Sequence, residues 1–500
     1  MPVDAGCETP PRLVRESILR RVWQMARGSD VGVLVAIALT SLLLRTLING
    51  RYGFHHDELL TYTNSLHLDW GYVPYPPMTA FLGRVELELF GASLRGFRFF
   101  GAVAQSLMML FAGLSARELG GKREAQIVTA IGSAIGGVTL VHGSFYSYTS
   151  FDQLFWILAA YFVIRLLKSD DPRWWLAIGV SIGLGMMAKY SIAFFALGVV
   201  GGLTLTPGRR YLRSPWLWCG AALALLIMLP NIVWQVRHDF VSLAYLRSIH
   251  ARDVANGSTD YFLLNQFWKT ANSVTVPLWL AGLWYLFRKP EGKRYRMLGW
   301  MYVITLVAFL IARGRDYYLA PAYPMLIAAG AVWRERWVST LSARAATDVR
   351  QTTWISLLTA MLCASALTLP IAPPEMVERV ARIRDSLPAE ERVRLAILAD
   401  DEGKAGAINL YGPAYGLPMA ISGMNSNWYR GYGDPPPQTV ITLGEHRDFL
   451  ERNFDSCVLA GRVSNRYGIV NSAVGWDEIF VCHRLRWSWP EFWKHFQYYG

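Results

Sequence analysis

Apolar segments long enough to cross a lipid bilayer recur along this chain, and they constrain its fold more than any other feature. A helix that crosses a hydrocarbon core of about 30 Å needs about 20 mostly apolar residues. With 53% hydrophobic and 17% charged residues and a mean hydropathy of +0.23, the 500-residue chain is too apolar for a soluble globular protein. We therefore predict an α-helical polytopic membrane protein with about 11 transmembrane helices. The spans are placed at 31–48, 99–116, 126–142, 151–167, 174–188, 191–206, 216–234, 267–287, 297–312, 318–333 and 353–371.

The positions of Lys and Arg predict how these spans are oriented, because basic residues accumulate in cytoplasmic loops. Every second connection is rich in them, as at 165–173, 209–213 and 288–296. This bias places the N-terminus in the cytoplasm, and an odd number of spans places the C-terminus outside. The net charge of +12 follows largely from the same asymmetry, so it does not indicate nucleic-acid binding. The first span carries Arg45 and lacks a cleavage pattern, so we expect a retained anchor.

The chain divides by composition into three parts. Residues 1–30 are a basic cytoplasmic tail, and 31–371 form the membrane module with a long first outer loop at 49–98. Helical patterns predict two surface helices in that loop, one headed by Asp57 and Glu58 and one that begins after the Pro76–Pro77 turn. Residues 372–500 alternate helix-like and strand-like segments, which predicts a small periplasmic α/β domain.

Two cysteines of the C-terminal segment lie in strand-like stretches. Cys457 and Cys482 could form a disulfide in an oxidising periplasm, or they could remain two buried thiols. The sequence leaves both alternatives open.

Three carboxylates stand where outer loops meet the membrane. Asp57 and Glu58 follow the first span, and Asp152 begins the fourth on the same side. Acids favour helix N-termini, so each could be a cap. The alternative is a catalytic role, because an acid at the membrane boundary is costly unless it faces a polar cavity or a partner.

Cations gather on the same outer side, against the overall charge bias. Lys189 ends the fifth span, and Arg313 and Arg315 lie in the short turn before Tyr317. Basic side chains at the ends of spans can simply extend along the apolar surface and place their charge at the membrane–water interface. We favour the alternative, an anion-binding site. Outer aromatics such as Tyr75 and Tyr317 either contact substrate or form an interfacial belt.

A metal site is the less favoured reading of the histidines near these acids. His55, His56 and His142 match no tight ligand spacing, so we expect no metal cofactor.

Carboxylates and cations at one interface suggest a definite reaction. A lipid phosphate leaves a sugar as a stable anion, which Lys or Arg can stabilise without a general acid. One carboxylate then suffices as general base for an acceptor hydroxyl, and attack from the opposite face inverts the anomeric carbon.

The segment HHDELLTYTNSLHLDWGYVPYPPMTAFLGRV resembles the first outer loop of the GT-C glycosyltransferases that include protein O-mannosyltransferases and lipid A aminoarabinose transferases. The likeness continues in order through SYTSFDQLFWILAAYF, GLGMMAKYSIAFF, MLPNIVWQVRHDFVSLAY, RDYYLAPAYPMLIAAGAV and AINLYGPAYGLPMAISGMNSNWYRGYG. It departs at 73–77, where relatives commonly carry a charged residue before the proline turn and this chain has Pro74 and Tyr75.

The resemblance implies roles for individual residues. Asp57 would be the general base, with Glu58 and Asp152 as further catalytic acids. Location and charge, more than any fixed motif, assign the polyprenyl phosphate to Lys189, Arg313, Arg315 and Tyr317, with Tyr75 as another substrate contact. The segment 422–433 is either a lid over the acceptor or an ordinary surface loop.

We accordingly predict an inverting inner-membrane glycosyltransferase. It moves a sugar from an undecaprenyl-type phosphate to a periplasmic acceptor, which could be lipid A, another envelope glycan or a protein. The alternatives are a transporter or flippase of lipid-linked sugars, which should carry mid-membrane charges and repeated halves, and a catalytically silent scaffold of similar fold. The identity of the sugar and of the acceptor is left open.

Overall fold

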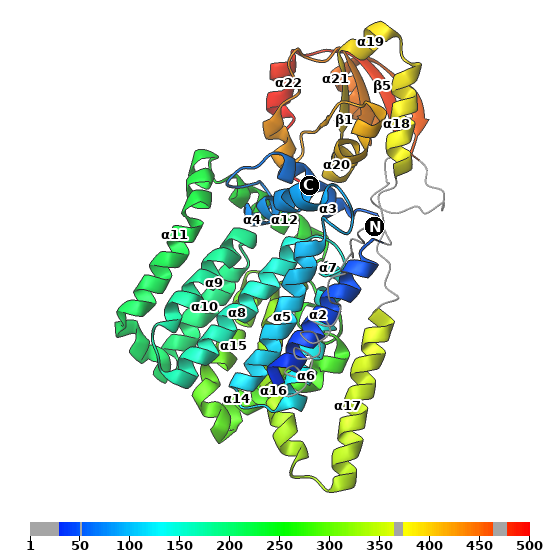
Figure 1. Cartoon of the computed structure of the whole chain (residues 1–500). Coiled ribbons are helices and arrows are strands. Elements are labelled where there is room, and N and C mark those ends of the chain that lie inside the picture. The colour runs from blue at the N-terminus through cyan, green and yellow to red at the C-terminus, as the bar shows by residue number, and fades with distance from the viewer. Residues whose placement is uncertain (1–29, 51–52, 365–373, 464–477) are drawn as a thin grey trace, which may run out of the picture.

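The computed structural model of the chain describes residues 30–50, 53–364, 374–463 and 478–500 (Figure 1). A bundle of helices forms the larger part, and a small α/β domain stands at one end of it (Figure 1). Short helices lie between the two parts. The predicted fold class, a helical membrane protein with a C-terminal α/β domain, is confirmed.

Five helical segments among the described residues are long and apolar enough to cross a membrane. They are α2 (Asp30–Ile48), α5 (Phe99–Glu118), α8 (Tyr148–Ser169), α11 (Pro215–Arg237) and the segment Pro290–Ile311, which includes α15 (Arg296–Ile311). A sixth is counted if α10 (Ile192–Thr204) and the bent 3-10 helix Pro207–Arg213 form one span. The predicted number of eleven therefore stays a prediction.

Several predicted spans correspond to shorter helices. These are α6 (Arg123–Ala134), α7 (Gly137–His142), α9 (Trp174–Ala188), α14 (Val276–Arg288) and α16 (Tyr323–Val338). The span predicted at 267–287 is broken before α14, where Asn272 adopts a left-handed backbone conformation. The last predicted span overlaps α17 (Ala343–Ala364), and its end at 365–371 lies outside the described residues, as does the predicted domain boundary at 371.

Small residues let these helices pack closely. A Cβ atom on Gly330 of α16 would collide with the carbonyl of Leu278 on α14, and one on Gly179 of α9 with the carbonyl of Gly220 on α11. Close backbone approach of this kind suits helices in lipid, where packing rather than the hydrophobic effect drives association.

Three short helices cover the end of the bundle beneath the α/β domain (Figure 1). They are α3 (His56–Leu66), α4 (Met78–Phe90) and α12 (Val241–Ala255). The first two confirm the surface helices predicted in the first outer loop.

The C-terminal domain contains one five-stranded sheet with the strand order β2-β1-β3-β5-β4. Its strands are β1 (Leu395–Ala399), β2 (Ala420–Ile421), β3 (Thr439–Leu443), β4 (Phe454–Arg462) and β5 (Glu478–Leu485). β1 pairs in parallel with β2 and β3, whereas β5 is antiparallel to β3 and β4. Its helices are α18 (Pro374–Ser386), α19 (Ala389–Val393), α20 (Glu402–Tyr411), α21 (Arg447–Asn453) and α22 (Trp489–His495).

The disulfide left open by the sequence is present. Cys457 and Cys482 face each other across β4 and β5 and are bonded.

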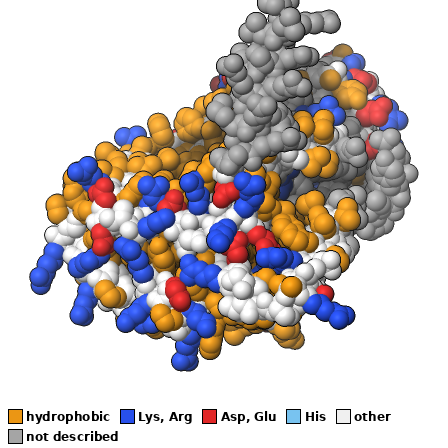
Figure 2. All heavy atoms as spheres, turned by 60° about the horizontal axis from the view of Figure 1, so that its bottom comes forward, with side chains coloured by type: hydrophobic (Ala, Val, Ile, Leu, Met, Phe, Trp, Pro, Cys, Tyr) orange, Lys and Arg blue, Asp and Glu red, His pale blue; other side chains and the backbone are white. Residues whose placement is uncertain are grey.

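The two ends of the molecule differ in charge. Lys and Arg side chains gather on the face opposite the α/β domain (Figure 2). The connections 165–173, 209–213 and 288–296 supply many of them. This is the face that the distribution of basic residues predicts to be cytoplasmic.

Candidate active site

The acid pair sits in the first turn of α3, and the two carboxylates have different surroundings. His55 is the N-cap, and its ring Nδ1 accepts a hydrogen bond from the Asp57 N–H (3.2 Å). Glu58 completes a capping box by accepting the His55 N–H (2.7 Å). The cap predicted as the alternative role is therefore taken by His55 and Glu58, and the Asp57 side chain is not used for it.

Glu58 is fully buried and forms an ion pair with Arg98. Its two oxygens lie 2.7 Å from Arg98 Nε and 2.6 Å from Nη2, and one also accepts the Tyr146 N–H (2.7 Å). Arg98 additionally donates to the carbonyls of Asn49 and Gly53. These bonds join α3 to the start of α5 and to the loop before α8, and they leave Glu58 no surface toward a substrate.

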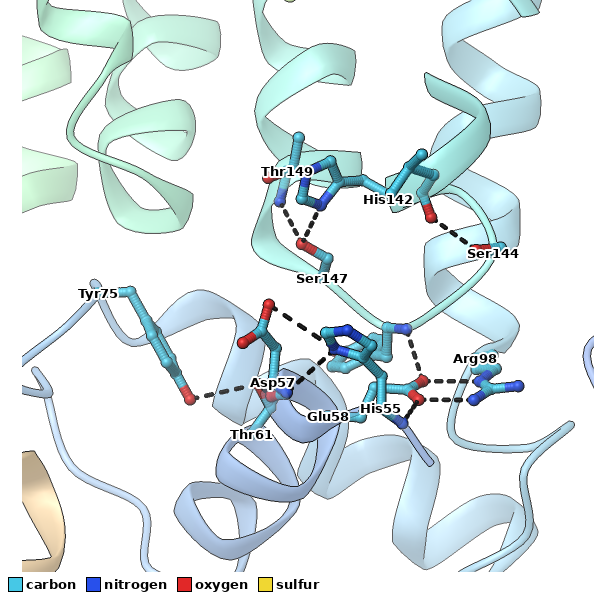
Figure 3. A network of polar contacts seen from close by, with 12 residues as sticks. His55, Asp57, Glu58, Thr61, Tyr75, Arg98, His142, Ser144, Ser147 and Thr149 are labelled. Atoms are coloured by element: carbon cyan, nitrogen blue, oxygen red, sulfur yellow. Dashed lines mark hydrogen bonds and ion pairs between the residues drawn. The ribbon is translucent and has the colours of Figure 1, made fainter. Parts of the chain in front are cut away.

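The Asp57 carboxylate, in contrast, is 48% exposed. It points away from the Glu58–Arg98 pair (Figure 3). Its nearest charged partner is His55, at 3.9 Å. Burial lowers the pKa of His55, although Asp57 and Glu58 oppose the shift. The lowered pKa favours the neutral form of the His55 ring.

Lys189 lies in a cage of tyrosine rings at the outer end of the bundle. Its ammonium is 5.2 Å from the ring centre of Tyr148, 5.0 Å from that of Tyr317 and 4.9 Å from that of Tyr318. Asp152 lies behind it at 4.0 Å. The faces of aromatic rings attract a cation, so the three tyrosines hold the Lys189 ammonium in place.

Asp152 is buried and pairs with Lys189. Its oxygens accept hydrogen bonds from Trp156 Nε1 (2.8 Å) and Ser191 Oγ (3.1 Å), and the residue is only 1% exposed. The sequence placed it among the catalytic acids, but its surroundings are those of a counter-ion.

Tyr148 and His142 connect the Asp57 region with Lys189. Lys189 lies over the Tyr148 ring, and the Tyr148 hydroxyl interacts electrostatically with Asp57. His142 interacts electrostatically with both Asp57 and Lys189. The predicted base and the predicted phosphate ligand therefore border one region.

The two arginines of the outer turn are separated by the fold. Arg315 forms a two-pronged ion pair with Asp253 of α12, at 2.5 and 2.7 Å, and this bond raises its pKa. Its charge also acts on Lys189. Arg313 is exposed, and among the described residues no acid lies within ion-pair distance of it. The structure thus brings Arg315, but not Arg313, to the cage.

Tyr75 is buried behind the site instead of lining it. Its hydroxyl accepts a hydrogen bond from Asn64 Nδ2 (2.6 Å) and donates to Thr61 Oγ1 (3.4 Å; Figure 3). Only 2% of Tyr75 is exposed, so the aromatic residue at the turn braces α3.

The C-terminal domain adds residues to the same region. Its α20 packs directly on α3, where a Cβ atom on Gly406 would meet Leu59 at 2.6 Å. At the start of α20, Glu402 is buried and accepts a hydrogen bond from Asn425. The pKa of Tyr245 on α12 is raised chiefly by burial. The negative charges of Glu402 and Asp57 raise it further, so both acids lie near this tyrosine.

The titration of Glu402 predicts a pH-dependent stability. Burial raises its pKa from 4.5 to about 7, so the folded protein holds this proton at pH values where the unfolded chain has released it. Stability is therefore lost as the pH rises from about 4.5 through about 7. Glu402→Gln should stabilise the protein by on the order of 1–3 kcal/mol at pH 8 and by much less at pH 5.

Unfolding of the full chain in detergent at pH 5 and pH 8 measures this effect. Glu390→Gln, on the exposed α19, serves as the control and should change little at either pH. An equal shift for Glu402→Gln at both pH values would contradict the assignment.

The histidines predicted as a minor metal alternative are packed against aromatic rings. His55 stacks on Phe145 with ring centres 4.3 Å apart, and His142 contacts the same ring at 5.3 Å. Within the described part of the chain, no group of three or more His, Cys, Asp or Glu side chains is placed to share a metal ion.

Several residues around the site were missed from the sequence. They are Arg98, Asp253, Glu402 and Arg430, the last of which donates a hydrogen bond to Asn64 of α3. Asp253 and Arg98 lie in outer loops whose acids and bases were visible but could not be paired. Arg430 lies in the segment 422–433, for which the sequence left a lid and an ordinary surface loop open, so this segment was the available signal.

Comparison with known proteins agrees with the fold described above. The family model described as dolichyl-phosphate-mannose-protein mannosyltransferase matches residues 74–234. Among solved structures, ArnT from Cupriavidus metallidurans bound to undecaprenyl phosphate superposes with a TM-score of 0.59 at 17% identity, covering 90% of this chain and 97% of that one. The same protein in its apo state gives 0.59 at 16% identity. The chain therefore has this fold, and the resemblance found in its sequence is confirmed.

Curated relatives come from Rhizobium johnstonii. The lipid A galacturonosyltransferase RgtD is 28% identical over 304 residues, which is 57% of this chain and 61% of the relative. The lipopolysaccharide core galacturonosyltransferases RgtB and RgtA are 27% and 24% identical, over 41% and 40% of this chain. The match spans 41% and 40% of the length of these two relatives.

Proposed function

We propose that this chain is an inner-membrane glycosyltransferase that transfers a hexuronic acid from a polyprenyl phosphate to lipid A or the lipopolysaccharide core. The observation that carries the proposal is the half-exposed Asp57 carboxylate, which borders the same region as the caged Lys189. The names of the relatives support the sugar and the acceptor, and the solved structure of similar fold was obtained with undecaprenyl phosphate bound.

The proposed reaction needs one base and one anion site. The Asp57 carboxylate takes the proton of an acceptor hydroxyl, whose oxygen forms the new bond to the anomeric carbon as the bond from that carbon to the phosphate oxygen breaks. The polyprenyl phosphate leaves as an anion stabilised by Lys189 and Arg315. Attack opposite the leaving group inverts the anomeric centre.

Glu58, Asp152 and Tyr75 are positioning residues in this proposal. Glu58 fixes the turn that presents Asp57, and Asp152 orients Lys189. Their burial argues against contact with either substrate.

The basic face supports the proposed orientation, with the N-terminus in the cytoplasm and the α/β domain in the periplasm (Figure 2). The disulfide in that domain agrees with an oxidising compartment. The concentration of ionisable groups at the outer end favours transfer chemistry over the transporter alternative, which calls for charges near mid-membrane.

Reconstitution of the purified full chain tests the function. Proteoliposomes supplied with a polyprenyl-phosphate hexuronate and lipid A should yield a product heavier by one hexuronate residue, detected by mass spectrometry. Movement of the donor across the bilayer without product would favour the transporter and overturn the proposal.

Lys189→Met should raise the KM for the donor by about 10- to 100-fold, because a charge-assisted hydrogen bond to phosphate is lost. Lys168→Met is the matched control, since Lys168 is an exposed lysine in the last turn of α8, at the opposite end of the bundle, where it pairs with Glu118. The double variant Asp152→Asn/Lys189→Met removes both charges and should fold while retaining the KM defect. If the KM for the donor were unchanged in both variants, the assignment of Lys189 to the phosphate site would be wrong.

A further inference from the structure

Arg430 is a cation that the C-terminal domain extends to α3. It ends the 3-10 helix Asn425–Arg430, and its Nη2 donates to Asn64 Oδ1 at 2.5 Å, across 366 residues of sequence. Its Nη1 donates to Asn427 Oδ1. The arginine therefore belongs to one domain and is held against a helix of the other.

Asn64 places this arginine on the same side of α3 as the proposed base. Asp57, Thr61 and Asn64 recur at helical spacing, so they share one face of the helix. Seven residues of helix rise by about 10 Å. This separation leaves room for a hydrogen bond from the acceptor hydroxyl to Asp57, a pyranose ring with its C6 carboxylate, and a hydrogen bond from Arg430 to that carboxylate.

The guanidinium is bonded to neutral groups only. Both of its hydrogen-bond partners are amide oxygens, and the structure shows no carboxylate within ion-pair distance of it among the described residues. Four other cations of this end, in contrast, are paired with an acid, in the pairs Lys189–Asp152, Arg315–Asp253, Arg98–Glu58 and Lys269–Asp316. A guanidinium carries five N–H groups, so the two bonds leave three for a ligand.

The charge of Arg430 is partly desolvated. Burial lowers its pKa, while the hydroxyls of Tyr75 and Tyr72 and the acid Glu402 oppose the shift. Glu402 is itself bonded to Asn425. Because a desolvated cation without a counter-ion is costly, a site of this kind favours an anionic ligand.

The orientation of Arg430 is fixed before a ligand arrives. Asn64 Oδ1 accepts the hydrogen bond from Arg430, and Asn64 Nδ2 donates to the Tyr75 hydroxyl (2.6 Å). That hydroxyl in turn donates to Thr61 Oγ1. A planar guanidinium held in this way matches a carboxylate, whose two oxygens it can bind side by side. The phosphate has a separate cluster at Lys189 and Arg315.

Resting on the proposed function, we propose that Arg430 binds the C6 carboxylate of the donor hexuronate and thereby selects acidic over neutral sugars. The C-terminal domain is then part of the donor site. This role explains why its segment 422–433 reaches α3.

The test compares two donors, a polyprenyl-phosphate hexuronate and the matching neutral hexose. Arg430→Gln should lower kcat/KM for the hexuronate by about 10- to 100-fold and leave the rate with the hexose unchanged. Arg430→Lys should retain part of the hexuronate activity. Arg462→Gln is the control, because Arg462 is an exposed arginine of the same domain that pairs with Glu478.

A second variant leaves Arg430 in place. Asn64→Asp keeps the shape of the side chain but supplies the missing acid, so it should cause the same selective loss. Equal loss with both donors in these variants, or full hexuronate activity in either of them, would overturn the inference. A wild-type enzyme that accepts only neutral sugars would also overturn it, whereas absence of transfer from every donor would instead refute the proposed function.

Discussion

Asp57→Asn is expected to lower kcat for sugar transfer by about 10²- to 10⁴-fold, the range contributed by a positioned general base. The amide has the shape of the carboxylate but cannot accept the proton of the acceptor. Because the Asp57 side chain is 48% exposed and does not cap α3, the variant should insert and fold as the wild type does. Donor affinity should change little, since the phosphate cluster is intact.

Steady-state kinetics in proteoliposomes, together with binding of the donor, measure this effect. Glu88→Gln is the matched control, because Glu88 is an exposed acid on the neighbouring surface helix α4, paired with Arg84. Retention of a substantial fraction of kcat by Asp57→Asn would show that another group takes the proton. A fully active Asp57→Asn variant would eliminate the catalytic role.

Glu58→Gln should destabilise the protein by about 3–5 kcal/mol, because it leaves Arg98 charged and buried without its acid. Both side chains are almost completely buried, at 0% and 1% exposure. The exposed pair of Arg84 and Glu88 provides the contrast, since Glu88→Gln should cost less than about 1 kcal/mol. Substitution of the two adjacent acids of α3 should therefore have different effects. Asp57→Asn should lower kcat, whereas Glu58→Gln should lower the stability of the fold.

Unfolding of the detergent-solubilised full chain measures the loss, and a double-mutant cycle identifies its source. Glu58→Gln combined with Arg98→Met should cost clearly less than the sum of the two single changes, because no charge is then left unpaired. Additive costs would indicate that the pair is not coupled. Wild-type stability of Glu58→Gln would contradict the buried ion pair itself.

Hydropathy and charge sufficed to predict the membrane class and the outer position of the acids. The resemblance then singled out Asp57, and location and charge singled out Lys189; the structure brings these two to one region through Tyr148 and His142. The individual roles were less accessible. Arg313 and Arg315 look equivalent in the sequence, yet only Arg315 meets an acid, because α12 presents Asp253 to it.

The sequence by itself determined that two acids stand in the first turn of an outer helix, because hydrophobic periodicity and capping are local properties. Only the tertiary structure decided which of them is free. Glu58 is buried against Arg98, 40 residues away, whereas Asp57 projects from another side of the same turn. Arg430 meets Asn64 across 366 residues. Such pairs depend on how α3, α5 and α20 pack, and no local pattern in the chain encodes that packing.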